Sequence, residues 1–394
     1  MMEFLNLIFI SFVCFLAIPT LFFSFQVFFA QKVIRSSSKT EERNFRVAVL
    51  VPAHNEEDVI SRTLQAIKPQ LGVNDSLLVV ADNCTDNTAV IAKKYSTHVI
   101  EREDENNRGK GYALDYGLQF LADSNPPEIV IVVDADCNLS SDCIDILAQK
   151  VKIEARPVQA LYLMESPEKK SISQAIAEFA WLVKNQVRPL GLMRFSLPCQ
   201  LMGTGMAFPW EILRQADLAH GNMVEDMKLG VDLAVSGFSP LFCPEALVSS
   251  EFPMSKDITN TQRKRWEHGH LSTILTETPR LLKAAVKQRD ITLLGMALDL
   301  SIPPLSLLAL CLGVMLVMNF FLAFLIGNFV AFGLMLSLSV IFSCAVLVSW
   351  YGFGRQVVSI KMLWGIPLYI LQKVPLYFSF LTKRQKNWVK TERR

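Results

Sequence analysis

The chain of 394 residues carries little charge, few histidines and no paired cysteine motif. Only 19% of its residues are Asp, Glu, Lys or Arg, against roughly a quarter in soluble domains, and the formal net charge is +2. Because this balance creates no broad positive field, we predict no nucleic-acid partner. The eight cysteines form no C-x-x-C pair and show no zinc-type spacing with the five histidines. They indicate scattered thiols in a reducing compartment, which excludes a disulfide framework and a zinc site.

Apolar residues are in excess, at 51% of the chain, and they gather near its two ends. Residues 4–30 carry no charge and are long enough to cross a bilayer as a tilted helix. A cleaved signal peptide is the alternative, but this segment has no basic leader, too long an apolar run and no A-x-A site after it. Five basic residues follow it, namely Lys32, Arg35, Lys39, Arg43 and Arg46. The positive-inside rule then places the N-terminus outside and the next domain in the cytosol.

Two more uncharged segments, 301–326 and 329–351, are joined by Gly327-Asn328 and are predicted to form a transmembrane hairpin. Residues 276–300, just before them, mix basic and apolar side chains. That pattern predicts interfacial helices with cations toward anionic lipid headgroups, and an ordinary surface helix is the alternative.

The segment 363–381 is apolar but contains Pro367, Lys373 and Pro375. If it crossed the bilayer, the basic tail at 382–394 would lie outside, against the positive-inside rule. We therefore predict an interfacial or re-entrant helix at 363–381, a cytosolic tail and three spanning helices. The chain is thus expected to be a multi-pass protein of the cell (plasma) membrane with a cytosolic domain.

That domain, residues 46–275, repeats a strand followed by a helix. Strands are predicted at Val47–Val51, Leu77–Ala81, His98–Glu101 and Ile129–Val133, and helices at Glu56–Ile67, Thr85–Tyr95 and Gly111–Leu121. Alternating units of this length predict an α/β fold with a doubly wound, Rossmann-like, mostly parallel sheet.

The run from Ile129 to Val133 is the centre of this domain. Its β-branched residues are typical of a strand buried on both faces. Asp134 and Asp136 follow at its carboxyl end, where open α/β sheets bind their ligands. Two carboxylates there suit a divalent cation that carries a diphosphate, and a solvated acidic turn is the alternative.

Polar residues also follow the other predicted strands. The first strand runs into a turn that contains Pro52, Ala53, Asn55 and Glu56. The second ends at Asp82, which suits a contact with a base or ribose, or else caps the next helix. In Arg108-Gly-Lys-Gly, Lys110 lies on a flexible turn that can present it to a diphosphate. A dinucleotide fingerprint is disfavoured because the third glycine and a clear preceding strand are missing.

These four segments, in this order, resemble the GT-A glycosyltransferases of family 2, and specifically their membrane-bound branch. The resemblance covers residues 46 to about 270 and continues into the membrane segments. It implies a nucleotide pocket made by Pro52, Ala53, Asn55 and Glu56, with His54 where the family often has Tyr. It also implies that Asp82 contacts uracil and that Lys110 is the lysine of the K-G-x-A turn. Asp134 and Asp136 then form the D-x-D pair. Asp136 is the expected ligand of Mg²⁺ or Mn²⁺, and Asp134 is a second ligand or a nucleotide contact.

Two later motifs narrow the resemblance. Glu225-Asp226 matches the catalytic E-D pair, in which the Asp takes the proton of the acceptor hydroxyl; a helix start that complements the dipole is the alternative. Gln262-Arg-Lys-Arg-Trp266 matches the Q-x-x-R-W motif of cellulose, chitin, hyaluronan and poly-N-acetylglucosamine synthases. On a helix Gln262 and Trp266 share one face, with Arg265 adjacent. A basic amphipathic helix near lipid is the alternative.

The resemblance gives these residues roles at the acceptor and the diphosphate. Trp266 would stack on a sugar and Arg265 would stabilise the leaving diphosphate. Thr204, in Gly203-Thr-Gly205, would contact the acceptor, unless the segment is simply a tight turn that needs glycine.

The resemblance implies an inverting transfer from a nucleotide diphosphate sugar, UDP-linked, to a growing polysaccharide at the cytosolic membrane face. The alternative is the transfer of one sugar to a membrane lipid of the polyprenyl phosphate, diacylglycerol or ceramide type. Three spans form a thin wall for a polymer channel, so export by the chain would require a homo-oligomer. An inactive scaffold is a third possibility, which the intact set of motif residues disfavours.

Overall fold

The computed structural model describes residues 2–30, 43–166, 170–219, 221, 224–252 and 256–383. The chain forms two compact units. We call the first the sheet unit; it contains Lys32–Pro167 and Leu197–Gly269. We call the second the helical unit; it contains Met1–Gln31, Glu168–Ser196 and His270–Gln385.

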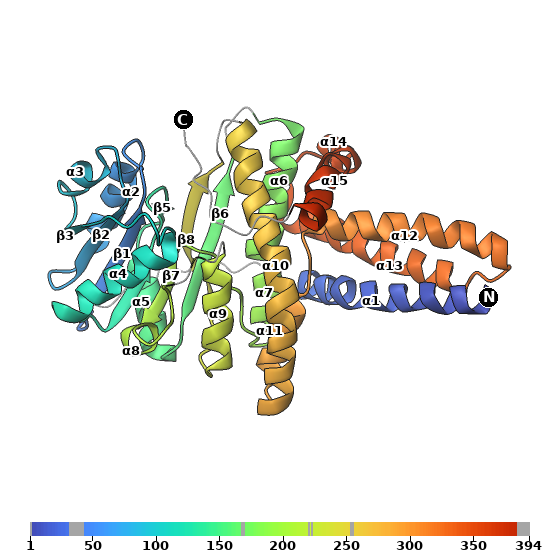
Figure 1. Cartoon of the computed structure of the whole chain (residues 1–394), viewed down its shortest axis with the longest axis horizontal. Coiled ribbons are helices and arrows are strands. Elements are labelled where there is room, and N and C mark those ends of the chain that lie inside the picture. The colour runs from blue at the N-terminus through green and yellow to red at the C-terminus, as the bar shows by residue number, and fades with distance from the viewer. Residues whose placement is uncertain are drawn as a thin grey trace. The chain divides into compact units, whose positions relative to one another are not determined.

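The sheet unit is built on eight strands in the order β3-β2-β1-β4-β7-β6-β8-β5 (Figure 1). Their bounds are β1 Val47–Ala53, β2 Ser76–Asp82, β3 His98–Arg102, β4 Ile129–Val132, β5 Asn138–Leu139, β6 Val158–Glu165, β7 Met206–Pro209 and β8 Leu241–Glu251. β3, β2, β1 and β4 are parallel neighbours, and so are β6 and β8. β7 runs antiparallel to β4 and β6, and β5 runs antiparallel to β8. The predicted doubly wound, mostly parallel sheet is confirmed, with a mixed half after β4.

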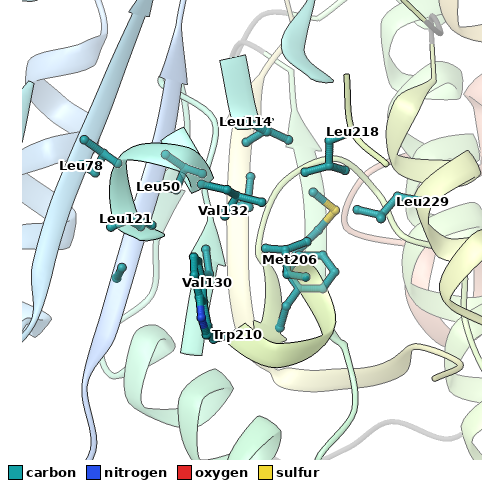
Figure 2. Packing of buried hydrophobic residues seen from close by; sticks show 14 of the residues in the cluster. Leu50, Leu78, Leu114, Leu121, Val130, Val132, Met206, Trp210, Leu218 and Leu229 are labelled. Atoms are coloured by element: carbon teal, nitrogen blue, oxygen red, sulfur yellow. The ribbon is translucent and has the colours of Figure 1, made fainter. Parts of the chain in front are cut away.

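Helices cover this sheet on both faces. Those of the sheet unit are α2 Ile60–Ile67, η1 Lys68–Gln70, α3 Thr88–Ala92, α4 Lys110–Asp123, α5 Cys143–Glu154, α8 Trp210–Leu213 and α9 Glu225–Val235. Figure 2 shows one face, where Leu50, Val132 and Met206 from the strands pack with Leu114 of α4 and Leu229 of α9. Side chains alternate along a strand, and the residues between these positions, among them Val49, Val51 and Ile131, are also fully buried. Burial on both faces explains why these strands read as continuous apolar runs.

Two helices of the sheet unit start later than the sequence predicts. α2 begins at Ile60. Before it, the backbone N–H groups of Glu56 and Glu57 donate to the side chains of Thr88 (2.8 Å) and Asp86 (3.1 Å). α3 begins at Thr88, whose N–H donates to Oδ1 of Asp86 at 3.0 Å. The turns after β1 and β2 therefore hold each other at the carboxyl ends of their strands.

The helical unit contains the apolar ends of the chain. Its helices are α1 Met2–Phe29, α6 Ile172–Leu182, η2 Val183–Val187, α7 Arg188–Met193, α11 Ile291–Leu300, α12 Leu305–Ile326, α13 Val330–Ser349, η3 Trp350–Gly354, α14 Ile360–Leu363 and α15 Ile366–Thr382. α10 (Lys256–Gln288) starts in the sheet unit and continues into the helical unit. In the described chain, three helices are long and apolar enough to cross a membrane: Leu7–Phe29, Leu305–Ile326 and Val330–Gly354. They correspond to the predicted segments 4–30, 301–326 and 329–351.

α1, α12 and α13 lie side by side (Figure 1) and share an apolar cluster that includes Phe23, Leu312, Met335 and Phe342. Residues 168–196, which the sequence analysis placed inside the catalytic domain, belong to this unit because Phe179 and its neighbours pack into the same cluster. Side chains of α6 and η2 therefore complete the apolar core of the three-helix bundle.

α12 begins at Leu305, later than the predicted 301, after the pair Pro303-Pro304. The predicted interfacial segment 276–300 is the second half of α10 followed by α11. The segment 363–381 is largely α15, which has 17 residues and contains Pro375. The placement of these helices against a bilayer stays a prediction.

A buried polar triad joins three helices of the helical unit. Arg188 of α7 donates to Oδ1 of Asp299 on α11 (2.7 Å) and to Oε1 of Gln26 on α1 (3.1 Å). Gln26 in turn donates to the same Asp299 oxygen at 2.6 Å. Gly191 is required beside it, because a Cβ there would lie 1.9 Å from the carbonyl oxygen of Gln26. Burying a charged pair costs desolvation energy, but once it is buried, the removal of one partner would be strongly destabilising because the other charge would be left uncompensated.

Candidate functional site

The residues predicted to bind a ligand lie where the parallel strands β1, β2 and β4 end. β2 ends at Asp82, β4 runs into Asp134, and α4 starts at Lys110. In an open α/β sheet this edge is the usual ligand site, and the first turn of α4 offers unpaired N–H groups to an anion.

Lys110 lies at the centre of the site. Its ammonium group is bonded to the Asp134 carboxylate, donates to the carbonyl oxygen of Gly203 at 2.7 Å, and lies 4.0 Å from Oε1 of Glu225. Burial alone would lower the pKa of Lys110, but the carboxylates of Asp134, Glu225 and Asp226 outweigh it and raise that pKa above its usual value. Lys110 is therefore held as a cation.

The Glu225-Asp226 pair reaches this lysine from the start of α9. Gly203 has a φ of 91°, and a Cβ built on it would lie 3.4 Å from Oδ2 of Asp226 and 3.7 Å from Nζ of Lys110. The structure thus brings together four of the predicted residues, Lys110, Asp134, Glu225 and Asp226, which come from three separate parts of the sequence. The glycine supplies both the left-handed backbone and the room for this approach.

Glu225 is the strongly perturbed acid of this group. Burial, and then the negative charge of Asp226, raise the pKa of Glu225 to about 7, against the opposing effect of Lys110. A raised pKa means that the folded chain binds this proton more tightly than the unfolded chain does. Its contribution to stability is therefore lost as the pH rises from the unfolded value of 4.5 to about 7.

Glu225→Gln should consequently increase the free energy of unfolding more at pH 8 than at pH 5, by on the order of 2 kcal/mol. Thermal unfolding of the detergent-solubilised chain at the two pH values measures this difference. Asp232→Asn on the same helix, where Asp232 bonds with Lys228 at 2.5 Å, is the control and should show no such gain. An equal effect of Glu225→Gln at both pH values would contradict the buried, high-pKa carboxyl.

Thr204 bonds with the segment that follows β4. Its side chain is fully buried, and Oγ1 accepts the backbone N–H of Asp134 at 3.0 Å. The same hydroxyl donates to Sγ of Cys137 at 3.4 Å. Thr204 therefore holds the backbone that carries Asp134 and Asp136, and its predicted contact with the acceptor stays a prediction.

Asp82 is also nearly buried, and it bonds with a residue that the sequence analysis did not name. Oδ1 of Asp82 accepts from Arg102 at 2.7 Å and from Asn83 at 2.9 Å. Burial raises the pKa of Asp82, and the Arg102 cation opposes that rise. His54 Nδ1 lies 2.7 Å from the carbonyl oxygen of Asp82, which ties the ends of β1 and β2 together.

The other predicted pocket residues lie around the turn after β1. Pro52 and Ala53 end that strand, opposite Val80 and Ala81 of β2. Asn55 has a φ of 55°, and its Oδ1 accepts the backbone N–H of Thr85 at 2.7 Å. Together with the hydrogen bond from the Glu56 N–H to Thr88, this bond holds the turn beside β2.

Asp134 and Asp136 are the residues that could hold a divalent cation. The described residues contain no group of three or more His, Cys, Asp or Glu placed to bind a metal by themselves. Hard cations such as Mg²⁺ are, however, commonly held by one or two carboxylates together with phosphate oxygens and water. Asp134 and Asp136, which follow β4 at the carboxyl end of the strand, fit that use as a pair.

Gln262, Arg265 and Trp266 lie on α10, as the motif predicts. Three residues after Trp266, Gly269 packs closely on the start of α9, since a Cβ there would lie 2.8 Å from Cγ1 of Val224. Arg265 is one turn before Gly269 on the same face of the helix. The close approach of Gly269 therefore positions this part of α10 beside the segment that begins with Glu225.

Two supporting residues escaped the sequence analysis. Arg102 belongs to no sequence motif, and its pairing with Asp82 could not be predicted because it depends on the register between β2 and β3. Gln159 is fully buried in β6, where it bonds through Nε2 to the Thr204 carbonyl (2.9 Å) and through Oε1 to the Met202 N–H (2.8 Å). A polar residue inside an apolar strand is the one signal that could have pointed to it.

A family model described as "Glycosyltransferase like family 2" matches residues 44–269, more than half of the chain. The chain belongs to this family. The match includes all of the predicted site residues, from Pro52 to Trp266. The predicted enzyme class is confirmed, whereas the cellulose and chitin synthase branch stays a prediction.

Parts of this glycosyltransferase are similar in sequence to two curated relatives. Probable glycosyltransferase YdaM of Bacillus subtilis (strain 168) is 25% identical over 261 residues, 62% of this chain and 59% of that protein. The 4,4'-diaponeurosporenoate glycosyltransferase of Staphylococcus aureus (strain N315) is 28% identical over 127 residues, 30% of this chain and 32% of that protein. The matches thus span less than two thirds of the length of either relative.

Among solved structures, the mannosyltransferase PcManGT from Pyrobaculum calidifontis, in complex with GDP-Man and Mn²⁺, is similar in fold. The TM-score is 0.54 at 14% identity, and the match covers 95% of this chain and 99% of that one. This likeness confirms the predicted GT-A fold.

Proposed function

We propose that this chain transfers a sugar, with inversion, from a nucleotide diphosphate sugar to an acceptor at the cytosolic face of the plasma membrane. The observation that carries the proposal is the convergence of Lys110, Asp134, Glu225 and Asp226 at the carboxyl ends of the strands. It supplies a cation and a carboxylate pair in one place, which group transfer away from a diphosphate requires.

The donor would lie across this edge with its base toward Asp82 and its diphosphate toward the start of α4. N–H groups in the first turn of α4 would bind phosphate oxygens, while Lys110 holds the Asp134 carboxylate in place. Mg²⁺ or Mn²⁺, bound by Asp136 with Asp134 as a further ligand, would supply positive charge to the departing diphosphate. The solved mannosyltransferase of the same fold contains Mn²⁺ beside a nucleotide sugar, which supports this cofactor.

The E-D pair would act on the acceptor. Asp226 would take the proton from the acceptor hydroxyl as that oxygen attacks the anomeric carbon from the face opposite the diphosphate. Glu225, with its pKa near 7, and Lys110 flank Asp226 and set its electrostatic surroundings. Arg265 and Trp266 would contact the diphosphate and the acceptor sugar, and Gln262 shares their helix.

Two acceptor classes remain candidates. The Q-x-x-R-W motif supports a growing polysaccharide, as the sequence predicts. The apolar cluster shared by α1, α12 and α13 favours a membrane lipid, because Phe23, Met335 and Phe342 pack together inside the bundle. The name of the Staphylococcus aureus relative also gives 4,4'-diaponeurosporenoate, and not a polysaccharide, as what is glycosylated.

The segment after the catalytic motifs supports membrane lipids as partners. Along the second half of α10, Leu275, Leu282 and Val286 are exposed at 61%, 39% and 81%. Lys283 and Lys287 are exposed beside them, whereas Leu281 on the opposite face is fully buried. An exposed apolar stripe flanked by lysines suits a helix that lies in the headgroup region.

Sealed membrane vesicles test acceptor class and orientation together. Vesicles with the cytosolic face outward should incorporate radiolabelled sugar when a nucleotide sugar is added outside, and right-side-out vesicles should not. A lipid acceptor predicts one extracted product enlarged by one sugar, whereas a polysaccharide acceptor predicts a ladder of lengths. Incorporation only in right-side-out vesicles would contradict the cytosolic site, and no incorporation with any of a panel of nucleotide sugars would contradict the proposed function.

A further inference from the structure

Arg102 and Asp82 form a buried pair at the end of the site where we place the nucleotide base. They are register partners at the last position of β2 and β3, and their side chains are 10% and 8% exposed. Residues 78, 80 and 82 of β2 share one face of the sheet, the face on which α4 packs. The pair therefore projects toward the side of the edge where α4 begins.

All hydrogen bonds that described residues donate to the Asp82 carboxylate go to one oxygen. Oδ1 accepts from Nη1 of Arg102 at 2.7 Å and from Nδ2 of Asn83 at 2.9 Å. Within the described part of the chain, Oδ2 accepts none. A carboxylate in this state has one oxygen committed to the protein and one left for a ligand.

Arg102 is itself locked and cannot turn away from Oδ1. Its Nη2 donates to Oδ2 of Asp104 at 3.0 Å, and its guanidinium lies 5.6 Å from the ring centre of Tyr112 on α4. The Arg102 carbonyl oxygen accepts the N–H of Asn83 at 2.7 Å, and Oδ1 of Asn83 accepts the N–H of Asp104 at 2.9 Å. Both terminal nitrogens of the planar guanidinium fork are thus fixed, and a lysine could not reproduce this because it has a single nitrogen.

The number of free oxygens on Asp82 distinguishes nucleotide bases. Uracil presents one ring N–H between two carbonyl oxygens, which one carboxylate oxygen satisfies. Guanine presents a ring N–H and an adjacent amino group, two donors side by side that match both oxygens of a carboxylate. If Oδ1 is already occupied, one guanine donor is left without a partner in a largely buried site, at a cost of about tenfold or more in affinity.

We infer that Arg102 determines the base specificity of the donor site: it occupies one oxygen of Asp82 and so selects uridine diphosphate sugars over guanosine diphosphate sugars. The inference rests on the proposed function, because it concerns the nucleotide end of the same donor site. It makes Arg102 a positioning residue that acts through Asp82. It also separates this chain from the solved mannosyltransferase of the same fold, which was captured with GDP-Man.

Equilibrium binding of UDP and of GDP to the full-length chain in detergent, with Mn²⁺ present, tests the inference without an acceptor. The wild type should bind UDP at least about tenfold more tightly than GDP. In Arg102→Met, Oδ1 of Asp82 keeps only its bond from Asn83 and regains a lone pair for the second guanine donor. The affinity ratio of UDP to GDP should therefore fall to within about threefold of one. Arg102→Lys, which keeps the charge and loses the fork, should give an intermediate ratio and provides a second variant if Arg102→Met does not fold.

Arg43→Met is the matched control. The Arg43 side chain is 7% exposed and bonds with Asp75 at 2.6 Å and with Asp145 at 2.5 Å. Arg43 and Asp75 precede β1 and β2, at the opposite end of these strands from Asp82. This variant should lower thermal stability and leave the UDP to GDP ratio unchanged, which separates specificity from simple loss of a buried arginine.

The possible failures are distinguishable. A wild type that binds UDP and GDP equally would overturn the inference and leave the proposed function standing. An Arg102→Met variant that keeps a tenfold preference would overturn the role of Arg102. A wild type that binds neither nucleotide would overturn the proposed donor site, and the inference with it.

Discussion

Asp226→Asn is expected to lower kcat by about 10²–10⁴-fold while the affinity for the donor nucleotide changes little. An amide cannot accept the proton of the acceptor hydroxyl, but it keeps the size of the side chain that lies beside Gly203 and Lys110. The effect should therefore fall on the chemical step. Initial transfer rates over a range of donor concentrations, together with direct UDP binding, separate kcat from affinity.

The same helix supplies two controls for this variant. Asp232→Asn removes an α9 carboxylate that is bonded to Lys228 outside the site, and it should retain transfer close to the wild-type rate. Glu225→Gln tests the neighbouring acid as a rival base. Transfer at the wild-type rate by Asp226→Asn, with Glu225→Gln inactive, would move the base from Asp226 to Glu225.

Removal of divalent metal is expected to lower transfer by at least about 100-fold, and Mn²⁺ or Mg²⁺ should restore it. The described residues contain no group of three or more His, Cys, Asp or Glu that could hold the metal, so Asp136 and Asp134 would need further ligands. The free protein should therefore bind Mn²⁺ weakly, and UDP should strengthen Mn²⁺ binding because its diphosphate supplies further oxygens. By linkage, Mn²⁺ should strengthen UDP binding by the same factor.

Calorimetric titrations of Mn²⁺ with and without UDP measure that coupling, and exhaustive treatment with EDTA measures the dependence of transfer on metal. Asp136→Asn should abolish the coupling. Asp142→Asn, at an exposed position six residues further along, should not. Unchanged transfer after metal removal, or intact coupling in Asp136→Asn, would rule out the assigned role of Asp136.

Much of the fold could be predicted because strong local patterns agree with it. The β-branched runs at β1, β2 and β4 are apolar because the sheet is covered on both faces, and their alternation with helical segments allows few topologies. The sequence also predicts that the polar residues after those strands lie close together, because parallel strands end at one edge of the sheet. The half of the sheet after β4 mixes parallel and antiparallel pairs and combines the short β5 and β7 with the longer β6 and β8, and it was not predicted.

Other contacts within the site could not be predicted, because burial and partners depend on contacts between distant segments. The glycine turn around Thr204 gives no sign that its hydroxyl bonds with the backbone of Asp134 and the thiol of Cys137. Arg102 looked like an ordinary end of a strand until the register with β2 placed it opposite Asp82. The segment 168–196 carries no charge pattern that separates it from its neighbours, and only its packing assigns it to the helical unit.

The amino-acid sequence by itself determined that this protein is an α/β glycosyltransferase of family 2 with three apolar helices long enough to span a membrane. Hydrophobic period, strand ends and motif order are local properties, so they can be read without coordinates. Only the tertiary structure decided which charges meet: that Lys110 lies between Asp134 and Glu225, and that Arg102 takes one oxygen of Asp82. The physical reason is that an ionised side chain acts over a few ångströms in space, and the distance along the chain does not report that separation.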